Sequence, residues 1–149
     1  MKTILFVPVI FLAASVGAGE TPSLSVAVTA DKTAYRHPAA DKPAVAAVAL
    51  EVKNESASMV ALTFPTGQRY DFVLYDKCGQ AVTRWSAERM FTMAFGRTQL
   101  AVGETRKFGD SLALAADGKG LPPGDYELEG VLSASPPNTS KRIKLKVAP

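Results

Sequence analysis

From Leu24 onward, apolar and polar residues alternate along much of the chain. Side chains two positions apart lie on the same face of a β-strand, so this spacing predicts strands with one buried and one solvent-exposed face. The first three stretches with this pattern carry their apolar residues at Leu24, Val26 and Val28, at Val48, Leu50 and Val52, and at Val60, Leu62 and Phe64.

Residues 70–75, Tyr-Asp-Phe-Val-Leu-Tyr, are apolar on both faces, which is typical of a central strand. Residues 76–79 follow as a four-residue turn, with a glycine at the position that favours positive φ. Residues 80–86 are therefore expected to return as the second arm of a hairpin.

The second half of the chain predicts further strands at residues 97–100, 105–114, 126–132 and 143–147. Gly109 interrupts the pattern of the second of these and suggests a β-bulge. Residues 87–95 are the one helical candidate, and they are too short and poorly capped to predict more than a loop or a single turn.

Seven to nine short strands separated by Gly- and Pro-rich turns predict an all-β protein, either a sandwich or a barrel. Tyr126 favours an immunoglobulin-like antiparallel β-sandwich, because it follows a breaker at the position of the tyrosine corner of such folds. An ordinary half-buried tyrosine is the alternative at this position.

The N-terminal 18 residues have the pattern of a secretory signal peptide: Lys2, an apolar run, and small residues before Gly19. A membrane anchor is the alternative, but the run is shorter than the roughly 20 residues that span a bilayer. We therefore expect residues 19–149 to form a single exported domain, in the periplasm, cell envelope or medium, with no stable membrane insertion after cleavage.

Composition excludes several classes of function. The formal net charge of +3 is too small to indicate nucleic-acid binding. Cys78 and His37 are the only cysteine and the only histidine in the sequence, so neither a disulfide scaffold nor a cluster of His and Cys metal ligands can form. No Gly-x-Ser-x-Gly motif and no phosphate-binding loop is present. We expect no enzyme activity, no catalytic residues, no metal and no cofactor.

The stretch from Phe64 to Phe91 carries a long ordered motif, with related turns further along the chain. Its residues are Phe64, Pro65, Gly67, Gln68, Arg69, Tyr70, Asp71, Phe72, Tyr75, Asp76, Gly79, Arg84, Trp85, Ser86 and Phe91, followed by Pro123, Gly124 and Tyr126. These residues resemble the intracellular proteinase inhibitor family, BsuPI, over about residues 45–132.

The resemblance implies an immunoglobulin-like sandwich that binds a protein partner, a bacterial serine protease of the subtilisin-like class. We therefore expect a proteinase inhibitor that acts through loops of the sandwich. A non-inhibitory envelope or surface module of structural or adhesive type is the alternative.

Within this stretch, the loop Ser86, Ala87, Glu88, Arg89 and Met90 is the candidate partner-binding segment, with Arg89 or Met90 entering a specificity pocket. A plain connecting loop is the alternative. Arg84 is expected to pair with Asp71 or Asp76, either as a structural ion pair or as part of a binding surface.

Overall fold

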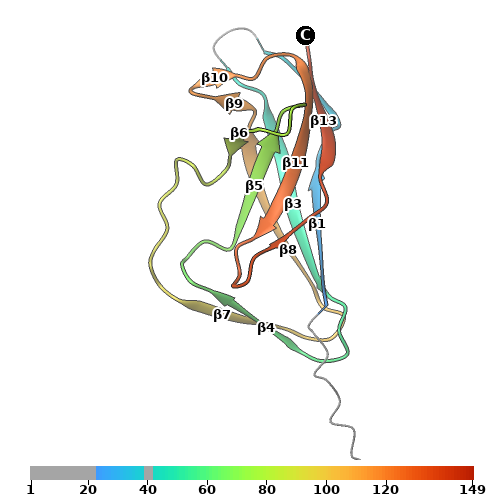
Figure 1. The fold of residues 1–149 in the computed structure, drawn as a ribbon, viewed down its shortest axis with the longest axis vertical. Coiled ribbons are helices and arrows are strands. Elements are labelled where there is room, and N and C mark those ends of the chain that lie inside the picture. The colour runs from blue at the N-terminus through green and yellow to red at the C-terminus, as the bar shows by residue number, and fades with distance from the viewer. Residues whose placement is uncertain (1–22, 39–41) are drawn as a thin grey trace, which may run out of the picture.

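Two β-sheets packed face to face form the body of the molecule (Figure 1). The computed structural model describes residues 23–38 and 42–149, and within them every regular element is a strand. The longer strands are β1 (Leu24–Ala30), β3 (Val45–Asn54), β4 (Val60–Phe64), β5 (Tyr70–Tyr75), β6 (Ala81–Arg84), β7 (Gly96–Leu100), β8 (Thr105–Ala113), β11 (Gly124–Leu132) and β13 (Ile143–Ala148). The shorter ones are β2 (Ala34–Arg36), β9 (Ala115–Ala116), β10 (Lys119–Gly120) and β12 (Asn138–Thr139). The predicted all-β sandwich is confirmed.

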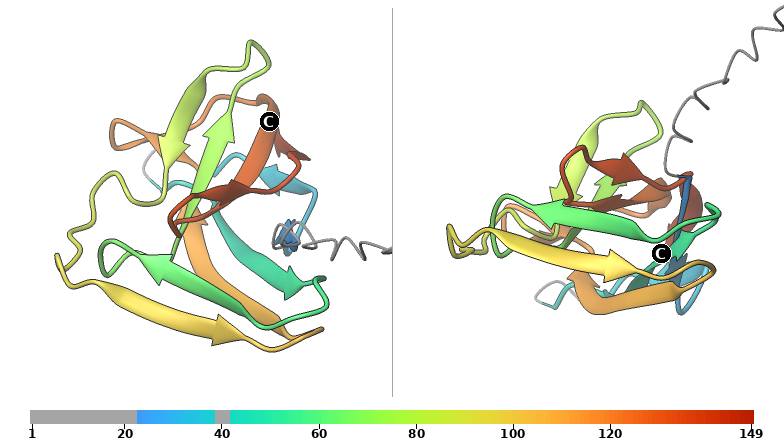
Figure 2. Two further views of the ribbon diagram at one scale, coloured as in Figure 1. Left: turned by 60° about the horizontal axis from the view of Figure 1, so that its bottom comes forward. Right: turned by 90° about the horizontal axis from the view of Figure 1, so that it is seen from below.

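One sheet has the strand order β1-β3-β8, and the other has the order β2-β13-β11-β5-β6, with β12 paired to β11. Strands β4 and β7 form a separate two-stranded sheet, which lies at one end of the sandwich, at the bottom of Figure 1 and of the left view of Figure 2. The long β6–β7 loop, defined as residues 85–95, therefore connects the edge of the larger sheet to this small sheet.

The core lies between the sheets and follows the alternation read from the sequence. In β3 every second residue from Ala46 to Asn54 is buried, and in β11 the same holds from Tyr126 to Leu132. Strand β5 is interior to its sheet, between β11 and β6, and residues 71–74 are buried on both faces. The predicted central strand is thus confirmed.

The two sheets lie close together at Gly130. A Cβ atom there would clash with the Leu50 side chain of β3 and would lie 3.1 Å from the Val28 Cβ of β1. The position therefore needs glycine for close packing of the layers.

Replacing Gly130 by alanine is expected to lower the free energy of unfolding by about 1 to 3 kcal/mol, because an added methyl group overpacks a dense interior. Urea denaturation followed by circular dichroism measures the change. Gly109→Ala is the matched control, since a Cβ there would meet only the Val48 carbonyl oxygen, at 3.8 Å. Equal losses in the two variants would contradict the close-packing argument.

The turn before β11 contains the expected tyrosine corner. The hydroxyl of Tyr126 donates a hydrogen bond of 2.7 Å to the carbonyl oxygen of Pro122, four residues upstream. Burial raises the pKa of this hydroxyl, with a smaller contribution from the charge of Asp76. The hydroxyl thus fixes the entry into β11, as in immunoglobulin-like sandwiches.

Two details differ from the sequence-based expectations. The β3–β8 register runs without a shift from Val45–Ala113 to Lys53–Thr105, with Gly109 opposite Ala49, so the predicted bulge is wrong. A bulge at Gly109 would have turned the inward side chains on one side of it toward solvent.

Strand β2 is absent from the sequence-based expectations. Its three residues pair in parallel with Lys146, Val147 and Ala148 of β13.

Candidate functional site

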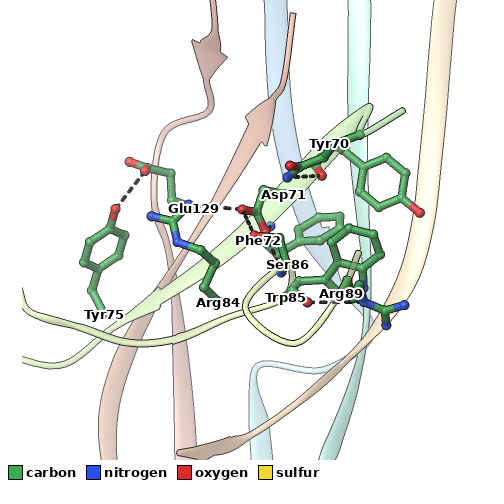
Figure 3. Close-up of polar contacts among 10 residues, drawn as sticks. Tyr70, Asp71, Phe72, Tyr75, Arg84, Trp85, Ser86, Arg89 and Glu129 are labelled. Carbon is green, nitrogen blue, oxygen red and sulfur yellow. Dashed lines mark hydrogen bonds and ion pairs between the residues drawn. The ribbon is translucent and has the colours of Figure 1, made fainter. Parts of the chain in front are cut away.

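A buried carboxylate holds the start of the β6–β7 loop (Figure 3). Asp71 on β5 is 3% exposed. Its Oδ2 accepts hydrogen bonds from Arg84 Nη1 at 3.0 Å and from the Ser86 hydroxyl at 2.6 Å, and its Oδ1 accepts one from the Ser86 backbone N–H at 3.1 Å. The expected ion pair of Arg84 is therefore made with Asp71 and not with Asp76.

An aromatic cluster lies directly beneath the same part of the loop. The ring of Trp85 packs against Tyr70 and Phe91, with centroid distances of 4.8 and 5.9 Å, and Tyr70 packs in turn against Phe108 of β8 at 5.4 Å. The backbone N–H of Trp85 donates to the Phe72 carbonyl oxygen on β5. Trp85 is half-buried and packs against the main core.

Arg89 folds back over this cluster. Its guanidinium carbon lies 4.1 Å from the centroid of the Trp85 ring, and its Nε donates to the Trp85 carbonyl oxygen at 3.2 Å. Its Nη2 lies 3.9 Å from Asp110 Oδ1 on β8. A cation stacked on an indole and close to a carboxylate is held in place by both. The contacts of Arg89 thus hold this part of the loop against the Trp85 ring and β8.

Asp110 completes the support from β8. The Tyr70 hydroxyl donates to its Oδ2 at 2.9 Å, and Trp85 Nε1, which is buried, faces the same carboxylate without meeting hydrogen-bond geometry. Burial opposes ionisation of Asp110, but the Ser111 N–H and the Tyr70 hydroxyl outweigh it and lower the pKa of the carboxyl group. Burial, and next the hydrogen bond to Asp110, raise the pKa of Tyr70.

The far end of the loop has a second tether. The Gly67 N–H donates to the Thr92 carbonyl oxygen at 2.8 Å, and a Cβ at Gly67 would lie 3.4 Å from the Thr92 backbone nitrogen and clash with its hydroxyl. The guanidinium group of Arg69 lies over the Phe64 ring at 4.4 Å and packs against Gly96. The motif residues just before β5 therefore hold the end of the loop.

The candidate partner-binding segment is divided by these contacts. Ser86 is half-buried on Asp71, and Arg89 lies on Trp85, whereas Ala87 and Glu88 are exposed. Met90 is 99% exposed. Residues 85–88 form a tight turn and residues 89–95 have no regular secondary structure, so the segment at 87–95 is a loop that begins within a single turn, as expected.

Two further apolar side chains of the β6–β7 loop are exposed. Met93 is 86% exposed and Phe95 is 69% exposed, on the same loop as Met90. The run Met-Phe-Thr-Met-Ala-Phe at residues 90–95 was the available signal, because it is apolar without the alternation of a strand. Only Phe91 of this run packs inward, against Trp85.

Other motif residues stabilise turns and sheet faces away from the loop. The Tyr75 hydroxyl donates to Glu129 on β11, Asp76 caps the β5–β6 turn, and Gly79 has the expected positive φ of 79°. Pro123 and Gly124 precede the tyrosine corner, and Gln68 donates to the Tyr70 carbonyl oxygen. These residues are structural in their contacts.

Two further features lie apart from the loop. A hollow of about 800 Å³ lies between the β5–β6 turn and strands β11 and β13, and it carries charges of both signs, including Lys77, Asp125 and Lys144. His37 is half-buried against Gly120.

Among residues 23–38 and 42–149, no three His, Cys, Asp or Glu side chains gather as a metal site would need. Over the same ranges, no helix has the length and apolar character required to cross a bilayer.

The family model for the BsuPI intracellular proteinase inhibitors matches residues 28–137. This description contradicts the predicted localisation: it names an intracellular inhibitor, so the expectation of an exported protein is wrong. The signal peptide predicted at residues 1–18 lies outside the described residues. No curated protein matches the chain.

Solved structures resemble the fold at low sequence identity. The sporulation control protein Spo0M from Bacillus subtilis is 16% identical with a TM-score of 0.52, over 85% of this chain and 49% of that one. The DNA glycosylase AlkC from Pseudomonas fluorescens, bound to DNA with an abasic site analogue, is 5% identical with a TM-score of 0.50, over 85% and 30%. The β-glucosidase EmGH1 from Erythrobacter marinus is 14% identical with a TM-score of 0.49, over 85% and 16%. The chain thus spans less than half the length of each, and the likeness to Spo0M and AlkC shows the fold alone.

The sequence motif and the family model agree on the same part of the chain. The motif residues that tether the β6–β7 loop, from Gly67 to Ser86, all lie inside the matched range. Since that range includes most of the sequence, the chain belongs to the BsuPI family of intracellular proteinase inhibitors.

Proposed function

We propose that this protein inhibits a subtilisin-like serine protease by placing the β6–β7 loop in the active-site cleft, with Met90 in the specificity pocket. The single observation that carries the proposal is the complete exposure of Met90 on a segment tethered on both sides. Family membership supplies the class of partner, a protease.

The backbone of the loop is suited to a protease cleft. Outside the strand ladders, residues 90–95 make one backbone hydrogen bond within the described part of the chain, from Gly67 to Thr92. A segment with unpaired N–H and C=O groups can pair in extended form, as an added strand, with the edge of a partner. The loop can therefore pair with a cleft that binds extended peptides.

The tethers favour inhibition over cleavage. Asp71 holds Ser86 on one side of Met90, and Gly67 holds Thr92 on the other. A held loop loses little conformational entropy when it binds, and both ends stay in place if a bond between the tethers is cut. The protease would then retain a bound loop instead of releasing two free fragments.

Met90 fits the specificity pocket better than Arg89, the other sequence candidate. Arg89 would have to leave the Trp85 ring and the Asp110 carboxylate before entering a pocket, whereas Met90 needs no rearrangement. Its flexible apolar side chain also suits a pocket lined by apolar groups.

Purified protein is expected to inhibit subtilisin in proportion to its concentration, and Met90→Ala is expected to raise the inhibition constant about 10- to 100-fold, as for a central apolar anchor. Steady-state cleavage of a chromogenic peptide measures both effects. Met59→Ala is the control, because Met59 is also exposed, at 58%, but lies between β3 and β4.

Met59→Ala should leave the inhibition constant unchanged. Lack of inhibition across a panel of serine proteases would contradict the proposed function. Equal losses in the two methionine variants would contradict the assignment of Met90 to the pocket.

A further inference from the structure

The methionines of the described residues are all exposed, and two of them lie on the β6–β7 loop. Met90 and Met93 are 99% and 86% exposed, and Met59, in the turn between β3 and β4, is 58% exposed. Methionine normally fills gaps in a core, where its sulfur is protected from solutes. Here the two loop thioethers are open to dissolved reagents.

A thioether in this position reacts with a peroxide. The sulfur lone pair attacks one oxygen of hydrogen peroxide, the O–O bond breaks, an S–O bond forms, and the other oxygen leaves as water after proton transfer. The sulfur is oxidised to a sulfoxide, and the peroxide is reduced. Exposure of the sulfur governs how readily this happens, so Met90 should react first and Met59 last.

The product has a different chemistry from the side chain that it replaces. A sulfoxide is polar and carries a strong hydrogen-bond acceptor, and such a group is costly to bury in an apolar pocket without a partner. The exposed Met93 lies three residues beyond Met90, so the same change would alter the surface beside the pocket.

We propose that Met90 and Met93 form a modification site at which peroxide oxidation to the sulfoxide weakens binding of the protease. The proposal rests on the proposed function for its effect on inhibition, but not for the modification itself. Reduction of the sulfoxides would restore the loop, because methionine sulfoxide is enzymatically reversible.

The test uses the full chain carrying Cys78→Ser, because the exposed Cys78 thiol would also consume peroxide. The protein is treated with hydrogen peroxide, the peroxide is removed with catalase, and peptide mass spectrometry follows sulfoxide at Met59, Met90 and Met93 over time. The inhibition constant against subtilisin is measured on the same samples, before oxidation, after it, and after treatment with methionine sulfoxide reductases.

Met90 and Met93 are expected to be oxidised before Met59, and the inhibition constant is expected to rise at least tenfold and to recover on reduction. In a Met90→Leu/Met93→Leu variant, peroxide should leave the inhibition constant at that variant's own starting value. In Met59→Leu, the full loss should persist. These variants distinguish the loop sulfurs from any other oxidised group.

An unchanged inhibition constant after full oxidation of both loop methionines would overturn the proposal, as would the same loss in the double leucine variant. Mass spectrometry reports the order of oxidation whether or not the protein inhibits subtilisin. Absence of inhibition before oxidation would contradict the proposed function, whereas oxidation of Met59 ahead of the loop would contradict the modification site.

Discussion

Replacing Asp71 by alanine is expected to lower the free energy of unfolding by about 2 to 3 kcal/mol. The substitution removes a buried carboxylate that accepts three hydrogen bonds, one from the Arg84 guanidinium group and two from the hydroxyl and backbone N–H of Ser86. The cost stays below that of a fully buried ion pair, since the Arg84 side chain is 49% exposed and water can solvate its charge. Urea denaturation measures the loss of stability.

The same substitution is expected to weaken inhibition more than tenfold and to speed cleavage within the β6–β7 loop. Without the carboxylate, the loop loses its tether before Met90 and has to be ordered on binding, which costs affinity. Inhibition constants and mass spectrometry of the digested protein at a temperature where the variant stays folded separate this effect from unfolding.

Asp71→Asn and Asp125→Ala are the matched variants. Asparagine keeps the shape and one acceptor, so it should lie between wild type and alanine, and the exposed Asp125 should change stability by less than about 0.5 kcal/mol. An Asp71→Ala protein with wild-type inhibition and an uncut loop would refute the tethering role.

Replacing Asn54 by alanine is expected to destabilise the fold by about 2 to 4 kcal/mol. Asn54 is fully buried at the end of β3, and its amide nitrogen donates to the carbonyl oxygens of Ser58, Leu100 and Ala101. Its Oδ1 accepts from the backbone N–H of Ser56. One side chain thus joins the β3–β4 turn to the segment after β7, and its loss leaves carbonyl groups without a donor.

Asn54→Asp tests the donor alone, because the side chain keeps its shape and its acceptor but would face three carbonyl oxygens without an N–H group. It should be at least as destabilising as alanine in urea denaturation at neutral pH. Asn138→Ala, at a half-buried asparagine of β12, is the control and should change stability by less than about 0.5 kcal/mol. Similar effects at the two positions would contradict the role of Asn54.

Much of the sandwich was predictable because burial and strand period act on adjacent residues. The alternation in β3 and β11 indicates which face of each sheet is buried, and the two apolar faces of β5 indicate a strand in the interior of its sheet. The turn at Gly79 and the tyrosine corner at Tyr126 are also local, since their contacts reach at most four residues along the chain.

Pairing between distant segments could not be derived in this way. Strand β2 is three residues long and has one buried residue, Tyr35. This is too short a pattern to indicate a strand, and β2 is recognised only from its pairing with β13. The missing bulge at Gly109 has a similar cause. The partner strand β3 is regular opposite this residue, and a lone glycine does not reveal that regularity.

The candidate site was predictable in its base but not in its exposed part. The Asp71–Arg84 pair follows from two adjacent strands, and that expectation is confirmed. The exposure of Met93 and Phe95 opposes their hydrophobicity, and the backbone hydrogen bond that holds this part of the loop joins Gly67 and Thr92, 25 residues apart. The use of Ser86, Ala87, Glu88, Arg89 and Met90 for partner binding stays a prediction.

Trp85 is the only tryptophan in the sequence, and it lies at the base of the β6–β7 loop beneath Arg89 and beside Phe91. An indole changes its emission with the polarity and charge around the ring. The tryptophan fluorescence of the protein therefore comes from the base of the loop at which we propose that the protease docks. On the proposed function, a docked protease excludes water from the surroundings of this indole, so complex formation is expected to change its emission and can be followed without attaching a dye.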